Sequence, residues 1–417
     1  MLIHNISQLV TMKGGPQRGR ELGRLGLIEQ GAVLIRGENI EAVGTEEELL
    51  RKYSDEPRLD ADGKAALPGF VDPHTHLVWA GDRALEFEMR LEGRTYLEIL
   101  AAGGGIISTV EATREADHDT LYAQTRNRAR SMLRHGTTTV EAKTGYGLEY
   151  KAEIDQLQVL LDLDKEGPLE IVPTFLPAHA IAPEYKTNPD GYTQLITGKM
   201  LPSAKIWWGK NGCRKPLPFV DVFCETGAFD LEQSRRIMTT ARDLGFPLKI
   251  HADEFDNLGG ASLAAELGAA SADHLVKTSA DDIKTLAASD TVVVSLPCTP
   301  FGLSDPHYTP AKEILAAGGI LALATDCNPG TAWCVNMQFV IALSCRALGI
   351  TPAQAIAAST INSAAAIQRQ DRIGSIEPGK QADILLLSVD DYHHIGYRFG
   401  ENLVNTVVKK GRIIPVC

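Results

Sequence analysis

Apolar runs that alternate with amphipathic stretches dominate the chain from about residue 67 to residue 370. The eight runs read ALPGFVDPHTH, GTTTVEAKTGYG, LEIVPTFLPAHA, PFVDVFCETGAF, PLKIHADE, ASADHL, TVVVSLP and ILALATDCNPG. Helix-period segments lie between or after them at 153–163, 233–244, 263–267, 280–288, 336–348 and 352–368. A strand followed by a helix, repeated, requires a parallel sheet. Eight such units in about 300 residues predict a (β/α)8 TIM-like barrel.

The two ends of the chain have another pattern, of short strands and turns. Residues 1–66 contain LIHNISQLV and GAVLIRGENIEAVG, followed by a short helix over 45–53, and residues 371–417 contain ADILLL and NLVNTVVKKGRIIPV. Neither end has enough apolar surface to close its own core. We therefore expect 1–66 and 371–417 to form one small composite β-sandwich domain beside a barrel domain of 67–370.

Composition narrows the possible partners. The formal net charge is −12 and no block of five like charges occurs, which argues against nucleic acid or an anionic membrane as partner. The seven cysteines are odd in number and never spaced Cys-x-x-Cys, which predicts neither a disulfide framework nor a zinc ribbon. No signal peptide and no run of ~18 apolar residues is present. We expect a cytoplasmic protein with a small-molecule substrate.

A His-x-His pair follows the first apolar run, in LPGFVDPHTHLVWAGDR. Side chains two residues apart on an extended backbone point to the same side. His74 and His76 are thus aimed at a common point, from which two imidazole nitrogens can reach one metal ion. Such a pair is also common on protein surfaces. Whether this one binds a metal ion therefore depends on which residues stand at the ends of the other strands.

The other strand ends carry more residues of the same kind. In a barrel the active site lies at the carboxyl ends of the strands, and there stand Tyr146, His179, Glu225, His251, Glu254, His274, Asp326 and Asn328. This gathering predicts a metal site. Neutral imidazoles with one carboxylate suit Zn²⁺ or Fe²⁺ and leave a position for water. That ligand set is His74, His76, His251 and Asp326.

Proton transfer needs a carboxylate beside the activated water. Glu254 or Asp326 can take that proton. His274 can polarise the electrophilic group of the substrate or, alternatively, hydrogen-bond to a metal ligand and orient it. Lys143 on the second strand raises a further alternative, because a carboxylated lysine can bridge two metals. The fourth strand carries Glu225, so we favour one metal.

An anionic substrate of this acidic protein requires a local cation. Arg83, seven residues past His76, offers a planar fork for a carboxylate. The alternative for Arg83 is an ion pair with Glu86 or Glu88. The glycines at 103–105 lack the spacing of a phosphate loop, so they favour a flap over the substrate.

Five motifs resemble the amidohydrolase superfamily over essentially the whole chain: PGFVDPHTH, IHADE, SADHL, ATDCNPG and PGKQADILLL. Within it, HTHLVWAGDR, AGGGI, TTTVEAKTGYGL, FLPAHA and HADEF are similar to the members that open an imidazolone ring in histidine degradation. The resemblance implies metal-dependent hydrolysis of the ring C–N bond of 4-imidazolone-5-propanoate to N-formimino-L-glutamate. It also implies one divalent or trivalent ion, zinc or iron, and a homodimer.

The family's functional positions fall on residues of this chain without a gap. The resemblance implies metal ligands at His74, His76, His251 and Asp326, and substrate contacts at Arg83, Tyr146, His179, Glu254, Asn328, Gly330 and Thr331. Catalytic roles fall on Glu254, His274 and Asp326.

Two alternative functions stay open. A mononuclear aminohydrolase of a nucleobase-like heterocycle would use the same ligands, and Arg83 is the feature that argues against it. A non-catalytic assembly subunit would be expected to have lost one or more ligands, and none is lost.

Overall fold

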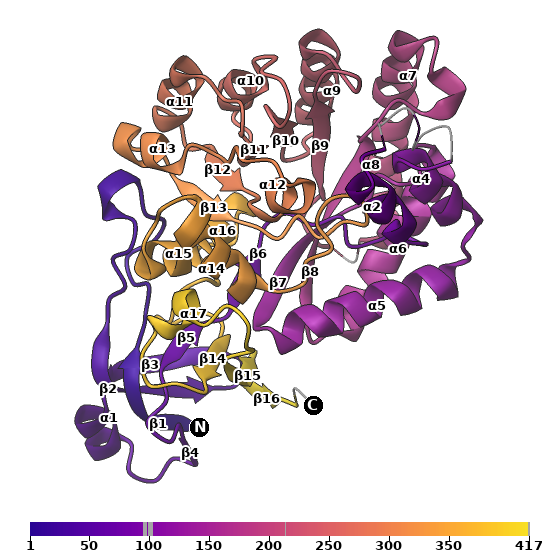
Figure 1. Cartoon of the computed structure of the whole chain (residues 1–417). Coiled ribbons are helices and arrows are strands. Elements are labelled where there is room, and N and C mark those ends of the chain that lie inside the picture. The colour runs from indigo at the N-terminus through magenta and orange to yellow at the C-terminus, as the bar shows by residue number, and fades with distance from the viewer. Residues whose placement is uncertain (95–97, 99–102, 213, 416–417) are drawn as a thin grey trace.

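Two sheets organise the protein, a closed parallel barrel and a second sheet built from both chain ends (Figure 1). The computed structural model describes residues 1–94, 98, 103–212 and 214–415. In Figure 1 the barrel and its helices fill the upper part, and the second sheet lies below with both chain ends. The predicted TIM-like barrel is confirmed, and so is the pairing of the two chain ends, which form one extra sheet where a small β-sandwich was expected.

The barrel consists of eight parallel strands in chain order, β6 through β13. They are β6 (Phe70–Asp72), β7 (Thr137–Lys143), β8 (Glu170–Ala178), β9 (Phe219–Cys224), β10 (Lys249–Ala252), β11 (Ser271–His274), β12 (Val292–Ser295) and β13 (Leu321–Leu323). Each lies in one of the eight apolar runs. A parallel bridge between Thr75 and Cys327, just past β6 and β13, joins the first strand to the last. The strand ends that hold the predicted site therefore meet in one ring.

Helices cover the outside of the barrel (Figure 1). They are α2 (Ala84–Leu91), α4 (Ile106–Glu115), α5 (His118–Arg134), α6 (Tyr150–Glu166), α7 (Pro189–Leu195), α8 (Leu201–Asn211), α9 (Leu231–Asp243), α10 (Gly260–Leu267), α11 (Ala280–Ala287), α12 (Cys298–Leu303), α13 (Ala311–Ala317), α14 (Met337–Ala347), α15 (Pro352–Ala358) and α16 (Ile361–Ala366). A π-helical turn over Ile196–Met200 joins α7 to α8. Capping boxes begin α9 at Asp230 and α11 at Ser279.

One predicted helix, over 352–368, is wrong as a single element, since the structure divides it into α15 and α16. The chain leaves helical geometry at Thr360, with φ −128° and ψ −92°. The break frees the carbonyl of Ser359, which accepts a hydrogen bond from Val71 N of β6 at 3.0 Å. Tertiary contact with the first barrel strand thus outweighs the local helix period.

The second sheet contains eight strands from the two ends of the chain. They are β1 (Leu2–Leu9), β2 (Ile28–Arg36), β3 (Asn39–Thr45), β4 (Arg58–Asp60), β5 (Ala66–Pro68), β14 (Ile384–Leu387), β15 (Val404–Lys409) and β16 (Arg412–Ile414). The ends join where β5 pairs antiparallel with β14, Leu67 opposite Leu385. Helix α1 (Glu46–Lys52) packs on this sheet. Helix α17 (His394–Tyr397) follows β14 and precedes β15 in the chain, and it packs against α14 and α15. The division into domains at 66/67 and 370/371 stays a prediction, and its last two residues lie outside the described residues.

Candidate active site and metal centre

A pocket of about 140 Å³ opens at the carboxyl ends of the barrel strands. Its walls include all but one of the predicted metal, catalytic and substrate residues: His76, Arg83, Tyr146, His179, His251, Glu254, His274, Asp326, Asn328, Gly330 and Thr331. The exception is His74, which is fully buried and packs against the rings of His76, His251 and His274. Residues from distant parts of the sequence are therefore brought to one cavity.

Backbone contacts at the end of β6 fix the two histidines of the His-x-His pair. The carboxylate of Asp72 accepts hydrogen bonds from the backbone N and the hydroxyl of Thr325, at 3.2 and 2.5 Å. Beyond it, His76 N donates to the carbonyl of Cys327 at 3.0 Å. These bonds hold the segment after β6 against the segment after β13, which carries Asp326.

Donor atoms of four residues converge beside the pocket. The Nε2 atoms of His76 and His251 lie 3.2 Å apart. Oδ1 of Asp326 lies 3.5 Å from Nε2 of His74 and 3.7 Å from Nε2 of His76. Ligand atoms around a tetrahedral ion with bonds of ~2.0–2.1 Å stand about 3.4 Å apart. The observed separations therefore suit a metal ion between these atoms.

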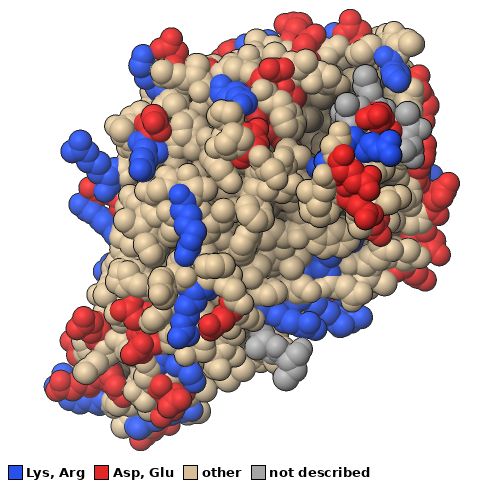
Figure 2. Space-filling view, in the orientation of Figure 1, with Lys and Arg blue, Asp and Glu red and all other residues tan. Residues whose placement is uncertain are grey.

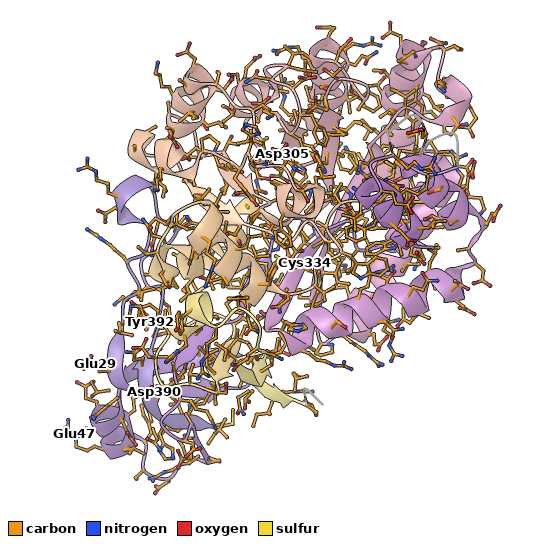
Figure 3. The ribbon with its side chains drawn as sticks, in the orientation of Figure 1. Glu29, Glu47, Asp305, Cys334, Asp390 and Tyr392 are labelled. Atoms are coloured by element: carbon orange, nitrogen blue, oxygen red, sulfur yellow. The ribbon has the colours of Figure 1, made fainter. Side chains whose placement is uncertain are left out.

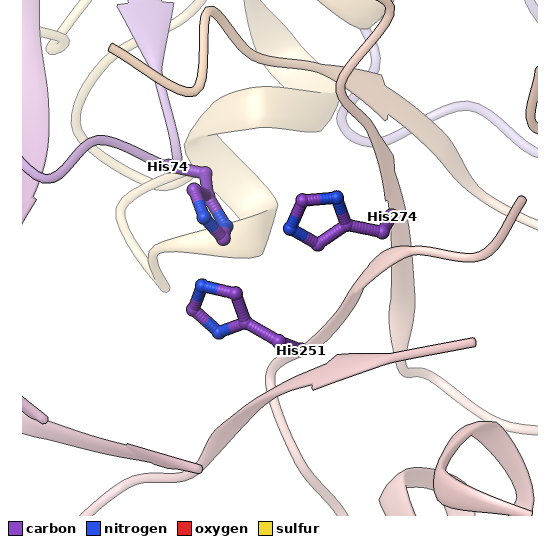
Figure 4. A group of neighbouring side chains, drawn as sticks. All are labelled: His74, His251 and His274. Atoms are coloured by element: carbon purple, nitrogen blue, oxygen red, sulfur yellow. The ribbon is translucent and has the colours of Figure 1, made fainter. Parts of the chain in front are cut away.

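Two more histidines lie close enough to join this cluster. His274 forms a compact group with His74 and His251, and His179 forms one with His76 and His251, with possible ligand atoms within 4.8 Å of one another. In Figure 4, His74, His251 and His274 come from three strand ends and their rings face a common space. Distance alone therefore does not show which of the five imidazoles would be metal ligands.

Buried carboxylates behind the histidines set the direction of their rings. Nδ1 of His74 lies 2.6 Å from Oδ2 of Asp273, and Nδ1 of His251 lies 3.0 Å from Oδ2 of Asp221. A proton held on Nδ1 by a carboxylate leaves Nε2 free as a metal ligand. Nε2 of His74 is buried and has no hydrogen-bond partner among the described residues. This orphaned nitrogen of His74 fits a metal site, and the acids behind the two rings favour His74 and His251 as ligands.

Lys143 lies inside the barrel among these carboxylates. Its fully buried Nζ stands 2.8 Å from Asp221, 2.9 Å from Glu141 and 3.9 Å from Asp273. Burial alone would lower the pKa of Lys143, but Asp221, Glu141 and Asp273 outweigh it and raise the pKa above its usual value. The nitrogen of Lys143 is thus engaged as an ammonium by three buried acids.

Burial sets the protonation of the pocket groups. It lowers the pKa of His74, His76 and His274 well below the usual value, which keeps these imidazoles neutral with a free lone pair. It raises the pKa of Asp326 to about 6. The pKa of Glu254 rises well above its usual value because of burial and of the charges on Asp326 and Glu225.

Glu254 and His274 lie side by side in the pocket, with 3.6 Å between Oε2 and Nε2. A carboxyl group with a raised pKa keeps its proton to higher pH than an ordinary carboxyl group, so it can act as a proton donor as well as an acceptor. The pair therefore offers a proton carrier and a neutral imidazole beside the convergent donor atoms.

Arg83 begins α2 and reaches the pocket from the side. Its Nε donates to Oε2 of Glu86 at 2.7 Å and its Nη2 to Oε1 at 2.5 Å, so the ion pair considered as an alternative is present. The Arg83 side chain is only 13% exposed, and it lines the pocket all the same. One edge of the guanidinium is taken by Glu86, and Nη1 on the other edge lies against Gly330.

The loop after β13 forms the wall next to Arg83. Oδ1 of Asn328 accepts hydrogen bonds from the backbone N atoms of Gly330 and Thr331, both at 2.8 Å. A Cβ atom added at Gly330 would lie 2.3 Å from Nη1 of Arg83, so glycine is what lets the guanidinium approach. Asn328 thus shapes the turn that carries two of the predicted substrate contacts.

Tyr146 and His179 line the pocket beside His76. The His179 ring stacks on His76, with centroids 4.5 Å apart and 16° between the planes. Nδ1 of His179 is 3.0 Å from the carbonyl of Gly145, and burial lowers the pKa of His179 to about 3. Burial also raises the pKa of Tyr146, which keeps its hydroxyl protonated as a donor.

Comparison with known proteins places this geometry in a family. The model of the amidohydrolase family matches residues 227–414. The chain is 51% identical to an imidazolonepropionase of Herpetosiphon aurantiacus over 413 residues, which cover 99% of this chain and 96% of that protein. It is 46% identical to an imidazolonepropionase of Chloroflexus aggregans, covering 99% and 98%. The chain belongs to the imidazolonepropionase family of amidohydrolases.

Solved structures agree on the architecture. A 5-methylcytosine deaminase from Klebsiella pneumoniae superposes with a TM-score of 0.74 at 18% identity, covering 100% of this chain and 97% of that one. An adenosine deaminase from Xanthomonas campestris with bound zinc gives 0.71 at 20% identity, covering 99% and 92%. These likenesses show the fold alone. The family and the histidine cluster support a divalent metal ion in this imidazolonepropionase-family chain.

Several residues of the site were not predicted. Ile106, Phe223 and Phe255 line the pocket, and Asp221 and Asp273 orient two of the histidines. A signal for Asp221 exists in the sequence, because this acid interrupts an apolar strand, whereas Asp273 lies in the polar strand SADH and has no such signal. Ile106, Phe223 and Phe255 carry no such signal.

The cysteines, the surface charges and the helix lengths can be compared with the expectations from composition. Five cysteines are described as free, Cys224, Cys298, Cys327, Cys334 and Cys345, and Cys334 lies in the loop between β13 and α14 (Figure 3). On the face seen in Figure 2, basic and acidic side chains lie in small separate groups. Among the described residues, no helix is long and apolar enough to cross a membrane.

Proposed function

We propose that the chain hydrolyses the ring C–N bond of 4-imidazolone-5-propanoate to give N-formimino-L-glutamate. The observation that carries the proposal is the 51% identity to an imidazolonepropionase over 99% of the chain. A pocket that combines clustered histidines and acids with Arg83 supports the same substrate, which has a polar ring and a carboxylate tail. The reaction consumes one water: its oxygen bonds to the ring carbonyl carbon, the bond from that carbon to the ring nitrogen breaks, and the nitrogen receives a proton.

His74, His76, His251 and Asp326 are the proposed holders of one metal ion, zinc or iron, divalent or trivalent. The convergence of their Nε2 and Oδ1 atoms supports this set, as do the acids behind His74 and His251. The buried charge of Lys143 supports one ion rather than two. When bound, the ion supplies the Lewis acidity that makes water a nucleophile near neutral pH.

Glu254 is the proposed proton carrier between the water and the leaving ring nitrogen. Its raised pKa and its place in the pocket support the role, which is typically worth ~10²–10⁴-fold in rate. Asp326 is the second candidate acceptor of the water proton. His274 lies beside Glu254 and is neutral, so it can polarise the ring carbonyl without repelling a cation.

Arg83 is the proposed partner of the propionate group. Its Nη1 edge, at Gly330, remains for the substrate while Glu86 holds the other edge. The loop that bears Gly330 and Thr331 would contact this end of the substrate, and Tyr146 and His179 would contact its ring. An aminohydrolase of neutral nucleobases has no need of a guanidinium at this place.

Metal analysis combined with turnover tests the proposal. Purified protein should contain about one equivalent of zinc or iron, and imidazolone propanoate should lose its ultraviolet absorbance on addition of enzyme. Equal turnover of a neutral nucleobase, or of an analogue without the carboxylate, would favour the aminohydrolase alternative instead. The homodimer is likewise proposed from the resemblance, and light scattering during gel filtration checks it.

A further inference from the structure

Glu225 follows β9 and is 2% exposed, yet the proposed reaction gives it no part. Both of its carboxylate oxygens accept hydrogen bonds from backbone N–H groups. Oε2 accepts from Phe255 N at 2.9 Å, and Oε1 accepts from Asp256 N at 3.1 Å and from Thr226 N at 2.8 Å. Among the described residues, no ion pair to Glu225 is recorded. Its charge is thus satisfied by the backbone of two loops.

Two of the three amides follow Glu254 directly in the sequence. The loop after β10 carries Glu254 into the pocket, and its backbone adopts a positive φ of 55° at Asp253. Such a loop needs external bonds to keep one conformation. On the upstream side, the carbonyl of Asp253 accepts from Lys277 N at 2.7 Å. On the downstream side, Glu225 supplies the bonds.

We propose that Glu225 is a positioning residue, which fixes the Glu254 carboxylate for proton transfer by holding the amides of Phe255 and Asp256. The proposal rests on the proposed function of Glu254. A carboxylate is suited to the task because it accepts on both oxygens and donates on neither. In Glu225→Gln, the NH₂ group of the side chain would face at least one of the backbone N–H groups. Two hydrogen-bond donors would then oppose each other, and that hydrogen bond would be lost.

Glu153 provides a matched control within the same chain. It is fully buried on α6 and also accepts three backbone N–H bonds, from Gly145 at 3.0 Å and from Gly147 and Leu148 at 2.8 Å. The loop that it holds carries Tyr146, and the Gly145 carbonyl lies against His179. Glu153 therefore positions the wall for the substrate ring, whereas Glu225 positions the proton carrier.

The experiment compares Glu225→Gln with Glu153→Gln. A misplacement of a reacting group by about 1 Å can cost ~10²-fold, so Glu225→Gln should lower kcat by about 10- to 100-fold with KM changed less than about threefold. Glu153→Gln should mainly raise KM. Metal content should stay at the wild-type ratio in both variants. Should Glu225→Gln fail to fold, Glu225→Asp replaces it, since the shorter carboxylate cannot reach all three amides.

A double variant separates positioning from general stability. If Glu225 acts through Glu254, then Glu225→Gln combined with Glu254→Gln should be no slower than Glu254→Gln alone, because a group already removed cannot be misplaced. Additive losses would overturn the proposal.

Amide hydrogen exchange gives a readout that needs no substrate. Glu225→Gln should speed exchange at Phe255 and Asp256 by about tenfold and leave 145–148 as in the wild type, and Glu153→Gln should do the reverse. Unchanged protection at Phe255 and Asp256 would overturn the positioning role even if the protein proved to act on another substrate. Failure of the proposed function would appear separately, as wild-type protein that does not turn over imidazolone propanoate.

Discussion

The floor and the rim of the pocket are built differently. The floor, His74, His76, His251 and Asp326, stands at strand ends, and two of its rings are backed by the fully buried Asp221 and Asp273. The rim, Arg83 with the loop 328–331, stands on a helix start and a loop. Its guanidinium is held by one acid, Glu86, which also accepts a bond from Gly105 N at 2.8 Å.

The difference teaches which part of the site carries which task. A floor fixed by the barrel offers the same donor atoms whatever enters the pocket, so we expect it to determine the chemistry. A rim on loops can change residue by residue without disturbing the strands, so we expect it to determine which substrate is held. Changes in the floor should therefore remove metal and reaction together, and changes in the rim should alter KM with the metal in place.

The largest expected effect comes from breaking the floor. His76→Ala, and likewise alanine at His74, His251 or Asp326, should abolish metal retention, because the three remaining ligands hold the ion weakly. Elemental analysis measures this loss, and circular dichroism should show that the fold largely survives. Wild-type metal content with intact activity in His76→Ala would show that the ion is held elsewhere.

The next effect concerns the chemistry above the floor. Glu254→Gln should bind metal normally and lose ~10²–10⁴-fold in kcat, the usual contribution of a proton carrier. Steady-state kinetics beside metal analysis gives both numbers for one preparation. Unchanged turnover would shift the role to Asp326 or His274.

Much of the floor could be predicted from the sequence, for a physical reason. The carboxyl ends of parallel strands meet in one ring, so a histidine at the end of one apolar run is necessarily near a histidine at the end of another. His76 and His251 are 175 positions apart in the chain, and their Nε2 atoms lie 3.2 Å apart. The alternation of apolar runs and helical segments along the sequence was therefore enough to predict that His76 and His251 lie close together.

The supports of the floor and the rim could not be predicted in the same way. Asp273 meets His74 across 199 positions, and which acid reaches which ring depends on the strand register and on side-chain direction. The ion pair of Arg83 with Glu86 was foreseen only as an alternative to the substrate contact. The structure has Arg83 in the ion pair and in the pocket wall together. The sequence does not show that the Arg83 guanidinium can bind Glu86 with one edge and line the pocket with the other.

Arg83 gives the test of the rim. Arg83→Lys keeps the charge without the fork and Arg83→Met loses both, so KM should rise stepwise, by about 30-fold or more for methionine. Metal content should not change in either variant. An analogue without the carboxylate should be a poor substrate for the wild type, and Arg83→Met should hardly worsen it. An unchanged KM in Arg83→Lys and Arg83→Met would mean that Arg83 only forms the ion pair with Glu86 and does not bind the substrate.

The smallest effect should come from Gly330→Ala, which adds a single methyl group to the rim. That Cβ would lie 2.3 Å from Nη1 of Arg83, whose other edge Glu86 holds, so the guanidinium must turn away from the substrate. Overpacking of this kind costs about 1 kcal/mol at a site that can adjust, so KM should rise about fivefold. Gly209→Ala is the matched control, because a Cβ there meets nothing within 4 Å. In an Arg83→Met background the same alanine should leave KM unchanged, since no guanidinium remains to be displaced. A fivefold rise that persists in that background would mean that the methyl group obstructs the substrate itself.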